Sequence, residues 1–353
     1  MRPGEPIFSV CIPQFNRTSF LIQALSALQR QTFRNFELCI SDGRSTDGRG
    51  SEIISFLKSS GMLYHYELRP QQARYDQNIR AAIALATGKY CFLLGNDDRP
   101  ESDSTFERLA SNLDHYGWSE IVITNYRELG TETIFRRVNA TALIGSGPKI
   151  AASMFRNFSF VSGILLDRSR AQSHSTAQWD GSEMYQTFVG CRMIAEGGRL
   201  LGLSDIVIAK DIQLSGEQAD SYALKPRVWP CPIVERSLPL VKLGQVAFHA
   251  VSPFINSAEL DQFIRRIFQQ LFVYTYPPWL IEYRRVQSWR YALGVALGMR
   301  PRNSMRGIPV GVVSRWYLRA IFGIVTFLGL TVPRFLFEQA KPKLYARAKR
   351  WRS

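Results

Sequence analysis

Residues 76–98 read DQNIRAAIALATGKYCFLLGNDD, and this stretch decides the fold. Its first half is an alanine-rich helix pattern that Gly88 ends, and its second half contains the apolar run KYCFLL, which is typical of a buried strand. A polar cluster follows that strand after a single glycine: Asn96, Asp97 and Asp98. A helix, a strand and a pair of carboxylates in this order predict one unit of a parallel sheet, with polar side chains at the carboxyl end of the strand.

The same alternation continues on both sides of this stretch. Strand patterns lie at residues 7–12, 36–41, 63–67, 89–94, 120–125 and 160–166, and helix patterns at 18–31, 51–60, 76–87 and 183–196. Strands and helices that alternate at this spacing predict an α/β fold, in which a mostly parallel sheet is flanked by crossover helices. Ligands of such open sheets bind at the carboxyl ends of strands, so we expect the site at residues 13–17, 42–47 and 95–99.

Composition limits the class of protein. The chain has 353 residues, of which 46% are hydrophobic and 12% aromatic, and this excludes wholesale disorder. Its five cysteines have no CxxC pairing and no metal-ligand spacing: Cys11, Cys39, Cys91, Cys191 and Cys231. An odd number of cysteines and an N-terminus without a secretory pattern favour a reducing, cytoplasmic location.

The net charge of +15 is unevenly distributed. Residues 1–224 hold 23 Lys and Arg against 24 Asp and Glu, whereas residues 225–353 hold 21 against 5, a net charge of +16. This shift, together with a proline cluster at residues 226–232, predicts a boundary there. We expect an α/β domain over residues 1–225 and a helical, basic region over residues 226–353. Basic surfaces attract nucleic acid and anionic lipid alike, so the sign of the charge does not choose a partner.

The pattern of the basic region favours lipid. Residues 262–276 place apolar side chains on one helical stripe, and residues 320–333 form an uncharged run of 14 between two arginines. A spanning helix needs about 20 apolar residues, so this run predicts a helix that lies in the membrane interface. Two competing interpretations are a helical cap on the catalytic domain and a nucleic-acid-binding arm. Nucleic acid would not bury the long apolar stretches, so we expect an anionic membrane surface as the partner and no nucleic acid.

The polar residues after two strands suggest a chemistry. Asp97 and Asp98 are hard oxygen ligands suited to Mg²⁺ or Mn²⁺ bridging a diphosphate, and the metal would neutralise charge on a departing nucleoside diphosphate. Asp42 follows an earlier strand and can accept hydrogen bonds from a base or ribose. Turn chemistry is the competing interpretation for all three aspartates. A further acid in the second loop, Asp47, is expected to cap a helix.

Three arginines in or near these loops are candidates to meet phosphates or the base: Arg17, Arg44 and Arg74. Solvated surface charge is the competing interpretation for each of them, and each is a weak signal when taken alone. Their order and spacing among the other strand-end residues carry more information than any single position.

The segments SVCIPQFNR, FELCISDGRSTDG and RYDQNIRAAIALATGKYCFLLGNDD together resemble glycosyltransferase family 2, which has the GT-A fold. They resemble in particular the subgroup that contains abequosyltransferases and related O-antigen sugar transferases. The resemblance is specific over residues 7–115, weaker to residue 215 and absent beyond. It implies an inverting enzyme that moves sugar from a nucleotide-diphosphate sugar to a lipid-linked or cell-surface polysaccharide acceptor, such as O-antigen, capsule or exopolysaccharide. It also implies a peripheral location at the inner face of the cell membrane.

The resemblance assigns roles to individual residues. It implies a nucleotide-sugar site that contains Pro13, Phe15, Asn16, Arg17, Asp42, Arg74, Asp76, Asn78 and Asn96. Asp42 would bind the base, usually a pyrimidine, and Asp76 and Asn78 would contact the donor. Asp97 matches the metal-binding aspartate of the family, for Mg²⁺ or Mn²⁺, and Asp98 would support that metal site or ligate through water. Gly95 stands where the first aspartate of the family motif usually stands.

The family uses a carboxylate to deprotonate the acceptor hydroxyl, usually from a Glu-Asp pair before an arginine-containing helix. Aligned on Arg192, that pair falls on Tyr185 and Gln186, neither of which can serve. Asp180 and Glu183 lie upstream, and either is a candidate for the base, with Glu183 favoured. The competing interpretation of Glu183 is an acid in the first turn of a helix.

Two further functions compete with sugar transfer. A nucleotidyltransferase of the same fold usually has an early glycine-rich phosphate loop with a basic residue, and the first loop here, PQFNRTS, contains no glycine. A catalytically inactive homologue is suggested by Gly95 and by the displaced base.

Overall fold

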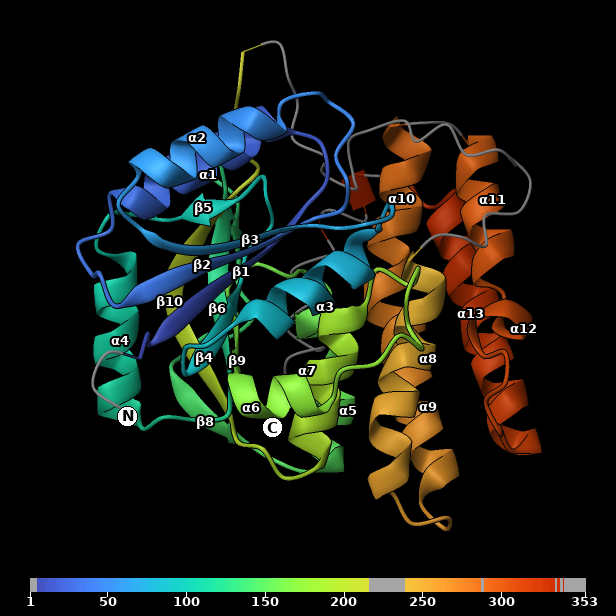
Figure 1. The fold of residues 1–353 in the computed structure, drawn as a ribbon. Helices are drawn as coiled ribbons and strands as arrows, with labels where there is room; N and C mark the ends of the chain where they lie inside the picture. The colour runs from blue at the N-terminus through green and yellow to red at the C-terminus, as the bar shows by residue number, and fades with distance from the viewer. Residues whose placement is uncertain (1–4, 216–238, 287–288, 334, 337–338, 340–353) are drawn as a thin grey trace. The chain divides into compact units, whose positions relative to one another are not determined.

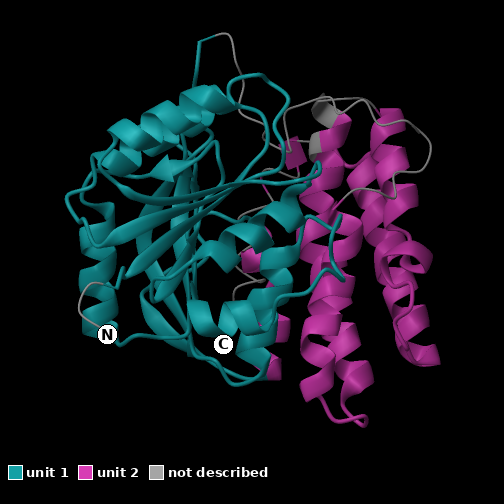
Figure 2. Cartoon of the chain, in the orientation of Figure 1, with its two compact units in different colours: residues 1–147, 160–220 teal, residues 148–159, 221–353 magenta. Residues whose placement is uncertain are grey.

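The computed structural model describes residues 5–215, 239–286, 289–333, 335–336 and 339 of the chain. The chain divides into two compact units, of which the first contains residues 1–147 and 160–220 and the second contains residues 148–159 and 221–353 (Figure 2). Residues 148–159 thus group with the C-terminal part of the chain. The boundary predicted at residues 225–226 lies outside the described residues.

The described part of the first unit is built on a ten-stranded sheet (Figure 1). The strands are β1 (Phe8–Gln14), β2 (Phe36–Asp42), β3 (Leu63–Leu68), β4 (Tyr90–Leu93), β5 (Arg99–Pro100), β6 (Ile121–Glu128), β7 (Ile134–Phe135), β8 (Ala142–Gly145), β9 (Ile164–Asp167) and β10 (Leu200–Lys210). Their order is β3-β2-β1-β4-β9-β6-β10-β5, with β7 beside β6 and β8 beside β10. Strand β9 is antiparallel to β4 and β6, whereas β3, β2, β1, β4, β6 and β10 share one direction. The predicted α/β fold with a mostly parallel sheet is confirmed.

Helices cover both faces of this sheet (Figure 1). One face carries α1 (Thr18–Gln29), α2 (Gly50–Ser59) and α4 (Thr105–Tyr116), and the other carries α3 (Tyr75–Leu85), α6 (Arg168–Ser173) and α7 (Tyr185–Ala195). Alternate residues of β1, namely Phe8, Val10 and Ile12, join the core beneath α1, α2 and α4. Cys11, between them, is fully buried and points to the other face because neighbouring side chains in a strand alternate. The sheet is therefore apolar on both faces, as a layered α/β sandwich requires.

A buried carboxylate, Glu37, ties together three segments near the start of β2. Its side chain is 0% exposed. It accepts hydrogen bonds from the Ser9 hydroxyl, from the backbone N–H (2.7 Å) and hydroxyl (2.9 Å) of Thr87, and from the Gly88 N–H (3.1 Å). Burial alone would raise the pKa of Glu37, but these donors outweigh it and lower the pKa below the usual value.

Replacing Glu37 with glutamine should lower the free energy of unfolding by about 2–3 kcal/mol at neutral pH, since hydrogen bonds to a charged acceptor are lost without a change of volume. A lowered folded pKa means that the carboxylate stabilises the fold above its unfolded pKa and loses this effect as the pH falls through the folded pKa. The difference between the two proteins should therefore shrink in acid. Urea unfolding at several pH values measures it, and a difference that does not change with pH would contradict the assignment.

The second unit is helical throughout its described residues. Its elements are α5 (Pro148–Met154), η1 (Phe155–Phe158), α8 (Pro239–Val251), η2 (Ser252–Phe254), α9 (Leu260–Gln270), η3 (Leu271–Thr275), α10 (Tyr276–Val286), α11 (Trp289–Met299), α12 (Pro301–Ser304) and α13 (Val312–Thr331). Helices α9 and α10 are continuous through η3, which is a single π-helical segment. The helical character predicted for the C-terminal region is present here.

Helix α13 packs along α9, η3 and α10 within this unit. The ring of Phe322 stacks on Tyr276 with centroids 5.5 Å apart and meets Phe272 edge-on at 5.4 Å. Gly329 lies against Leu280, so closely that a Cβ on this glycine would come within 2.6 Å of the leucine side chain. One side of α13 is therefore fitted closely to its own unit.

Candidate active site

The loop after β1 is held in an unusual backbone conformation. Asn16 and Arg17 both have left-handed backbone angles, with φ of 55° and 60°. The N–H of Asn16 donates to the Ser45 hydroxyl (2.7 Å), and the side-chain oxygen of Asn16 accepts from the Thr46 N–H (2.7 Å). The conformation is thus fixed by contacts to the loop after β2, and it directs the next side chain, Arg17, across the strand ends.

Asp42 closes β2 and is 1% exposed. One of its carboxylate oxygens accepts from the Ser45 N–H (2.7 Å) and the other from the Tyr66 hydroxyl (2.8 Å). Burial and the neighbouring Asp42 carboxylate raise the pKa of Tyr66, so the tyrosine stays a donor. Both oxygens of Asp42 are thus engaged by the protein, and a ligand would have to share a carboxylate that has about four acceptor sites.

The loop after β4 presents its two aspartates differently. The Arg17 guanidinium donates to a side-chain oxygen of Asp97 (2.9 Å), and both side chains of this ion pair are partly exposed. Asp98 is 2% exposed and accepts from the Asp211 N–H (3.0 Å) and the Ser162 hydroxyl. Burial raises the pKa of both aspartates. Asp97 is therefore partly exposed at the strand ends, whereas both carboxylate oxygens of Asp98 accept hydrogen bonds from the protein.

The backbone explains why this loop carries Gly95. A Cβ on Gly95 would lie 3.0 Å from a side-chain oxygen of Asp98 and 3.1 Å from one of Asp97. The N–H of Gly95 donates to the Ser162 hydroxyl (2.8 Å), the same hydroxyl that donates to Asp98. Both carboxylates thus fold back over the glycine, and any side chain there would have to displace them.

The residues that hold this loop come from distant parts of the chain. The Arg137 side chain is 5% exposed and donates to the carbonyls of Thr124 (3.1 Å), Ser162 (2.9 Å) and Phe160. Burial lowers the pKa of Arg137 to about 10. At the end of β10, the N–H groups of Asp211 and Ile212 donate to the side chain of Asp98 and the carbonyl of Asp97 (2.8 Å).

The donor atoms around Asp97 fit a divalent metal that the substrate helps to hold. Among the residues that the structure describes, no group of three or more His, Cys, Asp or Glu side chains forms a metal site. Mg²⁺ usually keeps several waters and binds through one or two carboxylates plus substrate phosphates. Asp97 supplies one such carboxylate, since only one of its oxygens is engaged by Arg17 in the pair described above. The protein thus supplies one carboxylate, and a metal held there would take its other ligands from substrate and water.

A second group of predicted residues gathers between α3 and α7. Asp76 is 0% exposed, and its two oxygens accept from the backbone N–H groups of Glu183 (2.7 Å) and Tyr185 (3.0 Å). Burial raises the pKa of Asp76. Glu183 itself has a left-handed backbone, with φ of 58°. Asp76 thus supports the turn that carries Glu183, and its own oxygens are directed into that turn.

Glu183 and Asp180 differ in their surroundings. Helix α7 begins at Tyr185, so Glu183 precedes it, and the interpretation of Glu183 as a first-turn acid is wrong. Asp180 forms an ion pair with Arg80 (2.7 Å) and is one-fifth exposed. The Asp180 carboxylate is therefore already engaged by a cation of the protein.

The remaining predicted residues line or support the strand ends. The Asn96 amide donates to the Gln14 side chain (2.8 Å), and the Asn78 amide donates to the backbone carbonyls of Gln14 (3.1 Å) and Ala73 (3.3 Å). Pro13 is buried in β1, Phe15 is partly buried in the loop that follows, and Arg74 is the exposed N-cap of α3. Gln14 thereby connects the loops after β1 and β4 with α3, a role that sequence analysis missed.

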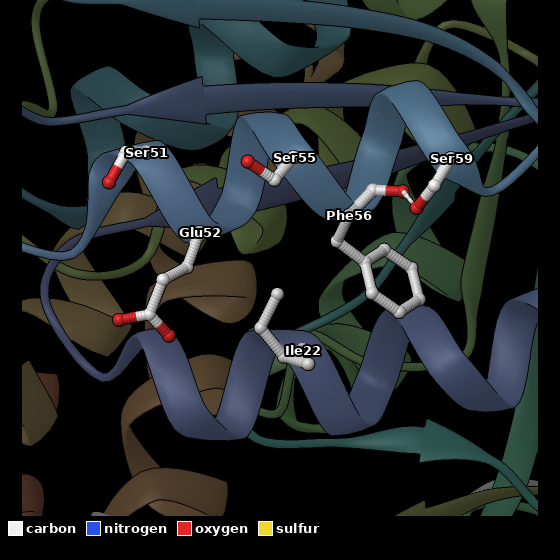
Figure 3. A pocket seen from close by; sticks show the side chains of 6 residues that line it. All are labelled: Ile22, Ser51, Glu52, Ser55, Phe56 and Ser59. Atoms are coloured by element: carbon white, nitrogen blue, oxygen red, sulfur yellow. Dashed lines mark hydrogen bonds between the residues drawn. The ribbon is translucent and has the colours of Figure 1, made fainter.

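A shallow hollow on the first unit lies elsewhere. It is lined by Ile22 of α1 and by five residues of α2: Ser51, Glu52, Ser55, Phe56 and Ser59 (Figure 3). Glu52 and Phe56 point toward Ile22, and Glu52 is paired with Arg49 at 2.7 Å. None of the predicted site residues lines this hollow, so it does not mark the chemistry.

Comparison with known sequences agrees with the motifs. The profile of Glycosyl transferase family 2 matches residues 9–166. Abequosyltransferase RfbV of Salmonella typhimurium is 31% identical over 130 residues, which cover 36% of this chain and 38% of that protein. The amylovoran biosynthesis glycosyltransferase AmsB of Erwinia amylovora is 28% identical over 169 residues, which cover 46% of this chain and 56% of that protein. The matched parts thus span 38% and 56% of the lengths of these two relatives.

Comparison with solved structures agrees with the fold. TarS of S. aureus in complex with UDP-GlcNAc matches with a TM-score of 0.59 at 15% identity, over 91% of this chain and 90% of that one. The mannosyltransferase PcManGT of Pyrobaculum calidifontis, in complex with GDP-Man and Mn²⁺, matches with a TM-score of 0.51 at 14% identity, over 93% of this chain and 88% of that one. The family profile spans the strand-end loops of this GT-A fold, so residues 9–166 of the chain contain a glycosyltransferase family 2 domain.

Proposed function

We propose that this chain is an inverting glycosyltransferase. It moves a sugar from a nucleotide-diphosphate sugar to a lipid-linked or cell-surface glycan acceptor in the synthesis of O-antigen, capsule or exopolysaccharide. The family 2 domain supports sugar transfer. Relatives named for abequosyl transfer and for amylovoran biosynthesis support a surface polysaccharide as the product.

The observation that carries the proposal is the linkage of three strand-end loops. Asn16 binds the loop after β2, which contains Asp42, and its neighbour Arg17 binds Asp97 in the loop after β4. Ligands of open α/β sheets bind at such a junction of strand ends. The linkage supports a nucleotide-diphosphate site at one edge of the sheet, for which we propose Asp42 at the base, Arg17 at the phosphates and Asp97 at the metal.

This arrangement supports the donor-binding roles that we propose. Asp42 accepts hydrogen bonds from the base, with Pro13 and Phe15 lining the same loop. Arg17 and Arg74 provide cations for the diphosphate, and Asn96 holds the strand ends in register through Gln14. Two residues hold other parts of the site in position. Asp76 holds the turn that carries Glu183, and Asn78 holds the end of β1 through the carbonyl of Gln14.

Asp97 would hold Mg²⁺ or Mn²⁺. The metal would neutralise the charge that develops on the departing diphosphate. Asp98 supports this site from beneath, because its oxygens bind Ser162 and the backbone of Asp211. Arg17 holds Asp97 in place and adds a second positive charge at the same edge.

Glu183 is the proposed general base. It removes the proton of the acceptor hydroxyl while that oxygen bonds to the anomeric carbon and the bond from this carbon to the diphosphate oxygen breaks. Attack from the face opposite the leaving group inverts the anomeric centre. Asp180 is the weaker candidate, because its carboxylate is paired with Arg80.

The acceptor and the location complete the proposal. A sugar chain that grows on a lipid must be reached at the bilayer, so we place the enzyme in the cytoplasm, peripherally on the inner face of the cell membrane. The excess of Lys and Arg over Asp and Glu in residues 225–353, 21 against 5, supports attraction to anionic lipid.

A thermal-shift screen tests the donor class. UDP, GDP, CDP and dTDP are each added with and without Mn²⁺, and the melting temperature is measured. One nucleotide should raise it by about 5 °C near saturation, and more with Mn²⁺ than without, because ligands that bind the folded state stabilise it. If no nucleotide changes the melting temperature, the proposal fails in favour of a catalytically inactive homologue.

A further inference from the structure

Helix α13 exposes an unusually apolar side. Its outward side chains include Val313 (72% exposed), Trp316 (66%), Ile324 (61%) and Phe327 (67%). Soluble proteins rarely expose apolar patches of this kind unless they bind a partner or a membrane. The exposed residues run along most of the length of the helix.

The opposite side of α13 is already occupied. Its buried residues are Ser314, Leu318, Phe322 and Gly329, which lie on one stripe at helical spacing. This stripe packs on α9, η3 and α10. The exposed apolar side is therefore not needed to hold the second unit together.

Positive charge borders the exposed side. At 3.6 residues per turn, Arg315 and Arg319 fall between the packed stripe and the apolar side. Both arginines are exposed, and the Arg319 guanidinium lies 5.5 Å from the centre of the Trp316 ring. An apolar helix side bordered by arginines and aromatic rings matches the order of a membrane interface, with acyl chains inside and anionic headgroups outside.

We propose that α13 lies in the plane of an anionic membrane surface, with the side that carries Val313, Trp316, Ile324 and Phe327 inserted among the lipids. This inference rests on the proposed function and names how the enzyme reaches a bilayer-held acceptor. A second copy of the chain is the other possible occupant of this side, and the test below distinguishes it from lipid.

The contacts at both ends of α13 favour a helix that lies in the plane of the membrane surface over one that crosses the bilayer. The helix is long and apolar enough to span a membrane, and 22% of its most apolar 18-residue stretch is buried. However, Asp261 accepts from the Gly311 N–H (2.8 Å) at its start, and Arg265 donates to the Ser314 hydroxyl (2.8 Å). At its end, the Arg284 guanidinium donates to the carbonyls of Leu330 (2.7 Å) and Val332 (2.6 Å).

These charged side chains lie on the packed side of α13. If the helix crossed the bilayer, its packed neighbours would enter the hydrocarbon with it, and charged groups at that depth are costly. A helix in the plane keeps Asp261, Arg265 and Arg284 on the protein side, away from lipid. Asp261 at the N-terminus and Arg284 at the C-terminus of α13 also suit the helix dipole.

Vesicle sedimentation with the full chain tests the proposal. Binding is measured to vesicles of phosphatidylcholine alone and to vesicles in which about a third of the lipid is anionic phosphatidylglycerol. The wild type should bind the anionic vesicles and be released by alkaline carbonate. The double variant I324E/F327E should bind them at least about tenfold more weakly, since two charges are placed in the apolar side.

A matched control carries the same charge change elsewhere. Leu63 and Leu143 are 54% and 55% exposed on the first unit, so L63E/L143E should bind vesicles as the wild type does. The melting-temperature rise with nucleotide should be equal in all three proteins. This readout separates failure of the membrane inference from failure of the proposed function.

Three results would overturn the inference. One is equal vesicle binding by the wild type and I324E/F327E, and another is wild-type protein that resists carbonate, which would indicate a spanning helix. The third is a wild type that is dimeric without lipid and does not bind vesicles, while I324E/F327E is monomeric, which would assign the exposed side to a second copy of the chain.

Discussion

Replacing Asp97 with asparagine should lower the rate of sugar transfer at least about a hundredfold. The substitution keeps the shape of the side chain but removes the charge that faces Arg17 and that would hold the metal. The metal-dependent part of the nucleotide-induced rise in melting temperature should also disappear. The rate is measured as release of nucleoside diphosphate, with and without Mn²⁺.

Asp205 provides the matched control. It lies on β10, where it accepts a hydrogen bond from the Asn112 amide (3.2 Å), and it belongs to neither group of predicted site residues. Asp205→Asn should leave the rate and the nucleotide response at the wild-type level. Unchanged turnover in Asp97→Asn would refute the metal role of Asp97, and an equal loss in both variants would point to a general effect on folding.

Replacing Glu183 with glutamine should lower kcat by about 10²–10⁴-fold, because the acceptor hydroxyl loses the group that takes its proton. Donor binding should be unchanged, since Asp76 holds the backbone of this turn through N–H groups that glutamine also has. The rate of the variant should keep rising with pH, as hydroxide replaces the missing base. Single-turnover rates over a pH series, with nucleotide affinity measured in parallel, test both points.

Asp180→Asn separates the two candidate bases. This substitution breaks the ion pair with Arg80 but leaves Glu183 in place. The fall in rate at low pH, called the acid limb of the pH profile, should therefore be retained, and the rate should drop less than in Glu183→Gln. If Asp180→Asn loses the acid limb and Glu183→Gln keeps it, the base is Asp180. If neither variant loses it, the base lies outside this turn.

The order of strands and helices in the first part of the chain could be predicted because periodicity there is strong. Leu21, Leu25 and Leu28 recur at helical spacing within the helix predicted at residues 18–31, and they are fully buried in α1. Strand β10 could not be predicted with the same ease. Its register is shifted in two places where it pairs with β6, and its middle residues are only partly buried, so it has no continuous apolar run.

The site could be predicted in part for a similar reason. The polar residues at strand ends directly follow apolar runs in the sequence, so Asp42, Asn96 and Asp97 could be identified from the sequence. Ser162, Arg137 and Asp211 were not, because they act on the Asp97–Asp98 loop from 40 to more than 100 residues away. Their local sequence has no pattern that distinguishes a loop support from an ordinary polar residue.

Asp76 illustrates a second limit. The family resemblance implied that it contacts the donor, but its carboxylate oxygens are directed at the N–H groups of Glu183 and Tyr185. Sequence spacing places Asp76 at the start of a helix and cannot reveal a partner 107 residues later. The role that we propose for it is therefore a positioning one.

The grouping of residues 148–159 with the second unit has a consequence for how the protein is made. Helix α5 packs on α8 and α9, which the ribosome delivers later than α5 itself. At the usual speed of synthesis, the stretch from residue 159 to the end of α9 takes about 5–20 s to emerge. During that time Ala151, Ala152 and Phe155, all 0% exposed in the finished protein, are without their final cover. The nascent chain therefore exposes an apolar segment until the helices that cover it have been synthesised.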